Sequence, residues 1–161
     1  MRMINLSAFV ALVLVFSSCK KELGMENAAN GSNAAAAASN SYNVKVNGTP
    51  VTGSVEAVIA PSSEQLVINA VGAAEEKVSI ILPAGIKPGT YDLQYLGDYM
   101  ATLDKGQETS SLISESGKIT ILERDEASGK VSGTFAFNAA NDDGSEKAAV
   151  TEGSFAAMVS K

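Results

Sequence analysis

The 161-residue sequence contains no histidine, no tryptophan and a single cysteine. Without histidine the chain has no serine–histidine triad, no histidine-ligated metal site and none of the commonest general base near neutral pH. Two pairs of adjacent acids, Glu75-Glu76 and Asp142-Asp143, fall in polar turns, which offer no low-dielectric cleft for glycosidase-type chemistry. We therefore expect no enzyme activity, no catalytic residue and no cofactor.

The single cysteine, Cys19, has no partner for a disulfide bond within the chain. It follows an apolar run at residues 8–16, which is too short to span a membrane because a spanning helix needs about 20 apolar residues. One basic residue, Arg2, precedes the run and two serines follow it, as in a secretory signal peptide. The sequence therefore predicts export.

The residues Phe16-Ser17-Ser18-Cys19 resemble a lipobox, the site where bacteria attach diacylglycerol to cysteine before cleaving on its amino side. The usual pattern has leucine at the position of Phe16. The resemblance implies that residues 1–18 are a lipoprotein signal peptide and that Cys19 is the lipid attachment residue. Two or three fatty acyl chains, palmitate among them, would make the anchor permanent, since one chain binds only reversibly. The alternative is an ordinary signal peptide that contains cysteine.

Lys20-Lys21-Glu22 bears on the side of the membrane that the protein faces. Bacteroidota lipoproteins that are moved to the cell surface resemble one another in carrying acidic residues just after the lipidated cysteine. Two lysines and one acid match that signal in part. We expect a lipid anchor in the cell outer membrane, with the periplasmic and the surface-exposed side both open.

Acidic residues outnumber basic ones, 18 to 12, which gives a net charge of −6. Removal of residues 1–18, which hold one basic residue and no acid, leaves 11 basic and 18 acidic residues, a net charge of −7. This excess argues against nucleic acid, which requires clusters of lysine and arginine, and against electrostatic binding to anionic lipid. The lipid must supply the membrane attachment by itself.

Residues 20–41 contain no aromatic or β-branched residue and are rich in Asn, Ser, Gly and Ala. Such a segment buries too little apolar surface to offset the entropy lost on ordering. We expect residues 19–41 to be the lipidated cysteine and a flexible linker that holds the domain about 25 Å from the anchor. Residues 42–161 are then a single domain.

Apolar and polar residues alternate from residue 42 onward, with the period of two that half-buried strands show. Two of these alternating sets are Leu66, Ile68 and Ala70, and Val78, Ile80 and Leu82. Asn47-Gly48 is a strong hairpin-turn signal, and no amphipathic helix pattern follows the linker. The sequence predicts an all-β fold, a single antiparallel β-sandwich or flattened barrel of about nine or ten strands.

The alternation slips by one residue in the last strand, where Val150 and Phe155 fall on opposite parities. We predict a β-bulge near Glu152-Gly153-Ser154 that turns both apolar side chains to the core. If Gly153 has a positive φ, replacing it by alanine should cost about 1 kcal/mol or more. The alternative is that one strand ends there and another begins.

Four segments carry a family resemblance: GTYDL at 89–93, SGKITILE at 116–123, VSGTFAF at 131–137 and GSF at 153–155. They resemble a family of small Bacteroidota lipoproteins over roughly residues 44–160. The β-domain of that family has no assigned activity. The resemblance therefore implies an exported β-domain on a lipid anchor and supplies no catalytic residues.

Tyr91, Tyr95 and Tyr99 fall within nine residues and are the best ligand candidates, because tyrosine is amphipathic enough to contact a sugar or a protein. Tyr91, Leu93 and Tyr95 would also share one face of a strand, which is typical of a core face. Sugar-binding platforms commonly use tryptophan, which this chain lacks. A ligand surface and a core face both stay open for the tyrosines.

Asp142, Asp143 and Glu146 could offer oxygen ligands to an irregular calcium site, although their spacing does not fit an EF-hand loop. A solvated hairpin loop is the simpler interpretation, and we expect no metal.

The function that we expect is a non-enzymatic binding or interaction module on the cell envelope, with a protein or glycan partner. The alternative is a lipocalin-like barrel that carries a small apolar ligand.

Overall fold

The computed structural model describes residues 40–106 and 111–160, which form nine β-strands. They are β1 (Ser41–Val46), β2 (Thr49–Ala60), β3 (Gln65–Gly72), β4 (Lys77–Pro83), β5 (Gly89–Asp92), β6 (Met100–Asp104), β7 (Leu112–Arg124), β8 (Lys130–Ala140) and β9 (Lys147–Ser160). The predicted all-β fold is confirmed. None of the described residues belongs to a helix long and apolar enough to cross a membrane.

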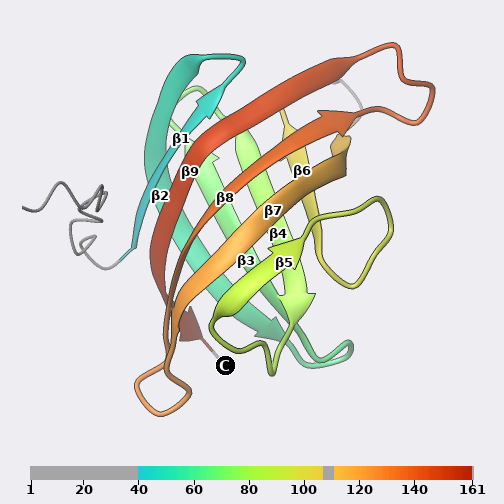
Figure 1. Ribbon diagram of the computed structural model, residues 1–161. Helices are drawn as coiled ribbons and strands as arrows, with labels where there is room; N and C mark the ends of the chain where they lie inside the picture. Colours follow the sequence, from blue (N-terminus) through green and yellow to red (C-terminus); the bar gives the residue numbers. More distant parts are fainter. Residues whose placement is uncertain (1–39, 107–110, 161) are drawn as a thin grey trace, which may run out of the picture. The chain divides into compact units, whose positions relative to one another are not determined.

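Eight of these strands close into a single barrel (Figure 1). Hydrogen-bonded neighbours follow the order β7-β6-β4-β3-β2-β1-β9-β8, and β8 pairs with β7 to complete the ring. All these neighbours are antiparallel, and a short parallel contact joins β2 and β9 at Ala57–Val159 and Val58–Ser160. Of the two architectures that the sequence predicts, the structure is the barrel. The β1–β2 turn uses Asn47-Gly48, with the two positive φ angles (49° and 82°) of a type I′ turn.

The barrel interior is filled by the side chains that the alternation predicts. An eight-stranded barrel is just wide enough for side chains to fill it. Every barrel strand contributes buried apolar side chains, including Val44, Val55, Leu66, Ile80, Leu103, Ile119, Phe135 and Val150, none of them more than 5% exposed. The interior is therefore a packed hydrophobic core.

The predicted β-bulge lies in β9. Phe135 of β8 pairs with Gly153 and Phe137 pairs with Val150, so two residues of β9 oppose one residue of β8. Val150 is fully buried and Phe155 is 3% exposed, as the prediction required. The positive φ belongs to Glu152 (52°) and not to Gly153. The expected reason for the glycine is therefore wrong: Gly153 is needed because the Phe135 ring lies where a Cβ atom would be.

One edge of β7 is shared by two short strands. β6 pairs with residues 112–113 of β7, and β5 pairs with residues 118–121 of the same edge. β5 lies outside the ring of eight and, among the described residues, pairs with no strand other than β7. Within the described residues, β5 is therefore an edge strand that is paired on one side only.

The directions in which the N–H and C=O groups of β5 point follow from the next residue, Leu93. Its N–H donates to the Gly117 carbonyl of β7 at 2.9 Å. Bonded and non-bonded pairs alternate along an antiparallel ladder. Tyr91 therefore also bonds to β7, whereas the N–H and C=O groups of Thr90 and Asp92 point away from it. We call this side of the strand, defined by the backbone of Thr90 and Asp92, the free edge of β5.

Candidate functional site

The three candidate tyrosines lie in and just after β5. Tyr91 is in the strand, Tyr99 directly precedes β6, and Tyr95 lies in the segment between them. β5 ends one residue after Tyr91, because the chain turns and Gln94 donates its N–H to the Tyr99 carbonyl at 3.0 Å. The strand face that the sequence suggested from Tyr91 to Tyr95 is therefore not formed.

Tyr91 and Tyr99 stack on each other, with ring centroids 4.7 Å apart and planes inclined by 28°. Both rings are half-buried and pack against the core, and the Tyr91 hydroxyl donates to the Lys87 carbonyl at 2.8 Å. Each ring covers one face of the other, so the pair presents ring edges and hydroxyls and no broad platform. Tyr95 is separate: it is 51% exposed and donates to Asp142 Oδ1 at 3.4 Å.

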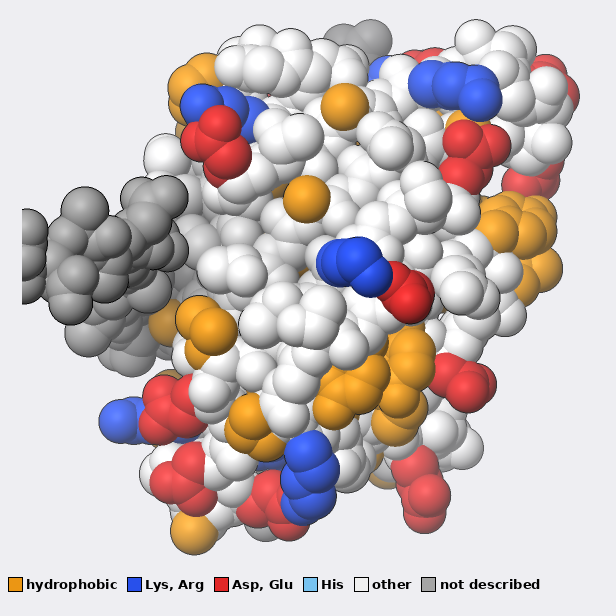
Figure 2. Space-filling view, in the orientation of Figure 1, with side chains coloured by type: hydrophobic (Ala, Val, Ile, Leu, Met, Phe, Trp, Pro, Cys, Tyr) orange, Lys and Arg blue, Asp and Glu red, His pale blue; other side chains and the backbone are white. Residues whose placement is uncertain are grey.

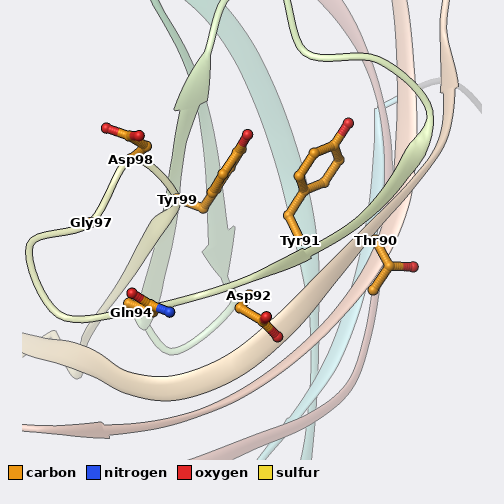
Figure 3. Close-up of a pocket in the computed structure, with 7 residues that line it drawn as sticks. All are labelled: Thr90, Tyr91, Asp92, Gln94, Gly97, Asp98 and Tyr99. Atoms are coloured by element: carbon orange, nitrogen blue, oxygen red, sulfur yellow. The ribbon is translucent and has the colours of Figure 1, made fainter.

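A pocket of about 400 Å³ opens beside the stacked tyrosines (Figure 3). Its lining residues are Thr90, Tyr91, Asp92, Gln94, Gly97, Asp98 and Tyr99. Figure 3 shows the two rings projecting to one side of β5 and Asp92 to the other. Successive strand residues point to opposite faces, so a pocket lined by three consecutive residues lies along the edge of the strand. β7 occupies one edge, and the pocket therefore lies along the free edge of β5.

The second wall of the pocket is held in place by a buried hydroxyl. Ser114 of β7 is the one fully buried polar side chain in the described part of the chain. Its Oγ accepts the Ala101 N–H at 3.0 Å and donates to the Gln94 carbonyl at 3.5 Å. Leu93, 1% exposed, anchors the same segment in the core. One side chain thus joins β6, β7 and the pocket wall.

The tip of this segment exposes apolar surface. Leu96 is 71% exposed and has a φ of 52°. The left-handed conformation costs a residue with a Cβ atom about 1–2 kcal/mol. Strained backbone positions cluster at functional sites, whereas a single exposed leucine is ordinary on a protein surface. The backbone conformation of the tip, which adjoins Gly97 of the pocket lining, is therefore the reason to include it in the candidate site.

The pocket rim is acidic. Asp92 forms an ion pair with Lys118 of β7, which compensates its charge. Asp98 is exposed and forms no ion pair within residues 40–106 and 111–160. Asp142 lies next to Tyr95 through the hydrogen bond described above. The rim therefore presents uncompensated negative charge to a ligand.

The side-chain oxygen atoms of the acidic turn between β8 and β9 are engaged in hydrogen bonds and an ion pair. Hydrogen bonds from the Ser145 side chain and backbone hold the pKa of Asp143 below its usual value. Glu146 pairs with Lys105 at 2.5 Å, and its N–H donates to Asn141 Oδ1 at 2.9 Å. No group of three or more acidic, cysteine or histidine side chains is placed to hold a metal ion in the part of the chain described. These contacts support the interpretation of this segment as a solvated hairpin loop.

A row of hydroxyl side chains crosses the outer face next to the pocket. Thr90, Thr120, Thr134 and Ser154 face one another in successive pairs on β5, β7, β8 and β9. Figure 2 shows much of the surface over these strands as white, with scattered charged and hydrophobic side chains. The pocket borders this polar row through Thr90.

Of the three candidate tyrosines, Tyr91 and Tyr99 line the pocket and Tyr95 does not. The sequence did not single out four other lining residues, Thr90, Asp92, Gln94 and Asp98. All four lie between or beside the tyrosines in the sequence. Proximity was a signal that could have found them. That β5 has a free edge depends on pairing with residues far along the chain, which no local pattern reports.

A family model described as a domain of unknown function (DUF6252) matches residues 43–158. The chain belongs to the DUF6252 family. The matched range runs from β1 into β9 and contains the whole pocket. No curated protein and no solved structure matches the chain. The DUF6252 match supplies no activity, and Cys19, the expected lipid attachment residue, lies outside the described residues.

Proposed function

We propose that this DUF6252 protein is a lipid-anchored outer-membrane lipoprotein of the Bacteroidota type, whose barrel is a non-enzymatic binding module. The observation that carries the binding role is the pocket along the free edge of β5. Aromatic rings converge there with the Asp98 carboxylate and with backbone groups of Thr90 and Asp92 that have no partner among residues 40–106 and 111–160. Such a concave site with a few convergent polar groups is the usual form of a ligand site.

The groups in the pocket suit binding better than catalysis. Asp92 is neutralised by Lys118, and the Tyr91 hydroxyl is held by the Lys87 carbonyl. Acid–base catalysis uses groups placed to donate and accept protons at one reacting centre. Asp98 forms no ion pair within the described residues, so no charged group is paired with it for that role.

A lipocalin-like role, the alternative from the sequence, requires an apolar cavity inside the barrel. The described strands fill the interior with buried aliphatic and aromatic side chains. An apolar ligand would have to displace them. We therefore place the ligand outside the barrel, against β5.

The anchor is tested by Cys19→Ser, which removes the proposed acylation site. We expect the variant to leave the membrane fraction and to keep its uncleaved leader, while Ser39→Ala in the linker behaves as the wild type. Unchanged partitioning into detergent for Cys19→Ser would contradict the anchor. Protease added to intact cells distinguishes the surface from the periplasmic face.

The binding site is tested by titrating the isotope-labelled full chain, carrying Cys19→Ser, with a panel of soluble saccharides and short peptides. We expect amide chemical shifts to change at residues 90–99. Changes confined to core residues such as Ile68 would place the ligand inside the barrel and contradict the proposed site.

A further inference from the structure

We propose that the ligand of this pocket is an extended peptide segment of a partner protein. The segment pairs with the free edge of β5 and places a lysine or arginine side chain against Tyr99 and Asp98. This inference rests on the proposed function, because it names the ligand class of the same pocket.

The free edge offers an ordered template for a further strand. Thr90 and Asp92 are exposed, and in the described part of the chain no backbone group bonds to them on the side away from β7. β5 is held in register by β7, from Gly89 opposite Ile121 to Asp92 opposite Lys118. A peptide that adds to a sheet edge gains main-chain hydrogen bonds, and pockets for alternate side chains give specificity.

β5 lacks three of the features that block an exposed edge, namely proline, lysine and a bulge, although its shortness is a fourth such feature. Natural edge strands carry proline, lysine or a bulge that prevents further pairing. The strand sequence is Gly-Thr-Tyr-Asp, and the ladder from β5 to β7 has no register shift. Among the described residues this edge is open, and the pocket beside it gives an added strand room for its side chains.

The chemistry of the pocket favours a cationic side chain. The stacked tyrosines present ring edges and hydroxyls, and a phenolic oxygen can accept a hydrogen bond from an ammonium or guanidinium group. Asp98 adds a carboxylate without an ion pair in the described chain, and the whole protein carries a net charge of −6. An acidic peptide would meet repulsion at the same rim.

The same geometry favours peptide over saccharide. A sugar ring packs best on an open aromatic face, whereas Tyr91 and Tyr99 cover each other and are half-buried. Saccharide hydroxyls can bond to single backbone groups, but an extended peptide repeats its donors and acceptors at the spacing of a strand edge. Peptide is therefore the ligand class argued for, and saccharide binding is an outcome of the test.

The experiment uses fluorescein-labelled octapeptides and the full chain carrying Cys19→Ser, with fluorescence anisotropy as the readout. Three probes are peptides in which threonine alternates with lysine, glutamine or glutamate. Two further probes are the lysine peptide with every second backbone nitrogen methylated, one for each of the two possible registers. We expect the lysine peptide to bind about tenfold more tightly than the glutamine peptide, equivalent to about 1.4 kcal/mol. The glutamate peptide and at least one of the two methylation registers should not bind.

Protein variants test the two parts of the site separately. Asp98→Asn should weaken the lysine peptide several-fold and leave the glutamine peptide unchanged, while Glu56→Gln, an exposed carboxylate on β2, should change neither. Thr90→Pro removes an N–H from the free edge without removing a bond to β7 and should abolish binding. If Thr90→Pro does not fold, the methylated peptides test the same hydrogen bonds from the ligand side.

The outcomes distinguish a failure of the edge pairing, of the cation preference and of the proposed function. Binding of both methylated registers as tightly as the parent peptide would overturn the edge pairing, and equal binding of lysine and glutamate peptides would overturn the cation preference. If saccharides but no peptide shift the amides of residues 90–99, this inference fails and the proposed function stands. If no member of either class shifts them, both fail.

Discussion

The two sides of β7 are built differently. On one side β8 pairs with it from Ile113 to Arg124, and the neighbouring strands carry a cluster of aromatic rings around Phe135. On the other side stand two short strands, β5 with four residues and β6 with five. A buried serine hydroxyl and a half-buried tyrosine pair connect them to the rest of the barrel.

This difference suggests that the β8 side contributes mainly to folding stability and the β5 side mainly to ligand binding. The β8 side buries large apolar side chains, which is the main favourable contribution to folding. The β5 side leaves backbone groups and ring edges exposed, which weakens packing and supplies contacts for a ligand. Substitutions should therefore act mainly on unfolding free energy on the first side and on ligand contacts on the second.

The largest effect is expected for Gly153→Ala on the β8 side. An ideal Cβ at Gly153 would lie 2.5 Å from Phe135 Cε2, so the ring or the strand must move. We expect the free energy of unfolding to fall by about 2 kcal/mol, as in overpacked cores, measured by urea denaturation. Gly85→Ala is the matched control, because nothing lies within 4 Å of its Cβ position. Equal effects at the two glycines would remove the close contact as the reason for Gly153.

Ser114→Ala tests the connection on the β5 side. It leaves the buried N–H of Ala101 unpaired, which we expect to cost about 1.5 kcal/mol of unfolding free energy. It should also raise amide exchange selectively at residues 93–99. A loss of global stability alone would instead raise amide exchange throughout the barrel. Ser132→Ala on β8 serves as the control. Uniform exchange changes in Ser114→Ala would mean that the hydroxyl does not position the pocket wall.

The stability of the barrel should depend on pH through Tyr42 in the core. Burial, and secondly the charge of Glu76, raise the pKa of Tyr42 above its ordinary value of about 10. The folded state therefore holds the phenolic proton more tightly than the unfolded state. The resulting stability is present below about pH 10 and is lost above it, at about 1.4 kcal/mol per pH unit.

Tyr42→Phe should remove that loss, and Tyr95→Phe, at an exposed position, should keep it. Urea midpoints measured from about pH 8 to about pH 11 check both variants. The same pH dependence in Tyr42→Phe and in the wild type would contradict the assignment to Tyr42.

The smallest effect is expected at the tip of the pocket wall. Leu96→Asn places a residue that tolerates positive φ at a position with φ of 52°. We expect a gain of about 0.5 kcal/mol in unfolding free energy. Leu122→Asn, at an exposed leucine of β7 that lacks a positive φ, should give no gain. A gain at both positions would mean that replacing an exposed leucine by a polar residue is itself stabilising, and that relief of backbone strain is not the cause.

Local sequence patterns predicted the features that depend on near neighbours. The alternation at Leu66 and Ile68 located buried strand residues, and Asn47-Gly48 located a type I′ turn. The parity slip between Val150 and Phe155 located the bulge in β9, because burial of both side chains demands one extra residue.

Features that depend on distant partners were not predictable in this way. Gly153 is required by the Phe135 ring on another strand, and Tyr91 finds its stacking partner in Tyr99 only because β5 ends early. Barrel and sandwich share one alternation pattern, and the pairing of β7 with β8 distinguishes them. The free edge of β5 arises from the same non-local pairing.

The free edge of β5 is the central claim, and amide hydrogen exchange in the unliganded protein tests it most directly. We predict that the Thr90 and Asp92 amides exchange rapidly while Tyr91 and Leu93, which bond to β7, are protected. Addition of the threonine–lysine peptide should then slow exchange at Thr90, at Asp92 or at both. Protection of Thr90 and Asp92 equal to that of Leu93 in the protein alone would show that the edge is already paired, and would contradict the account.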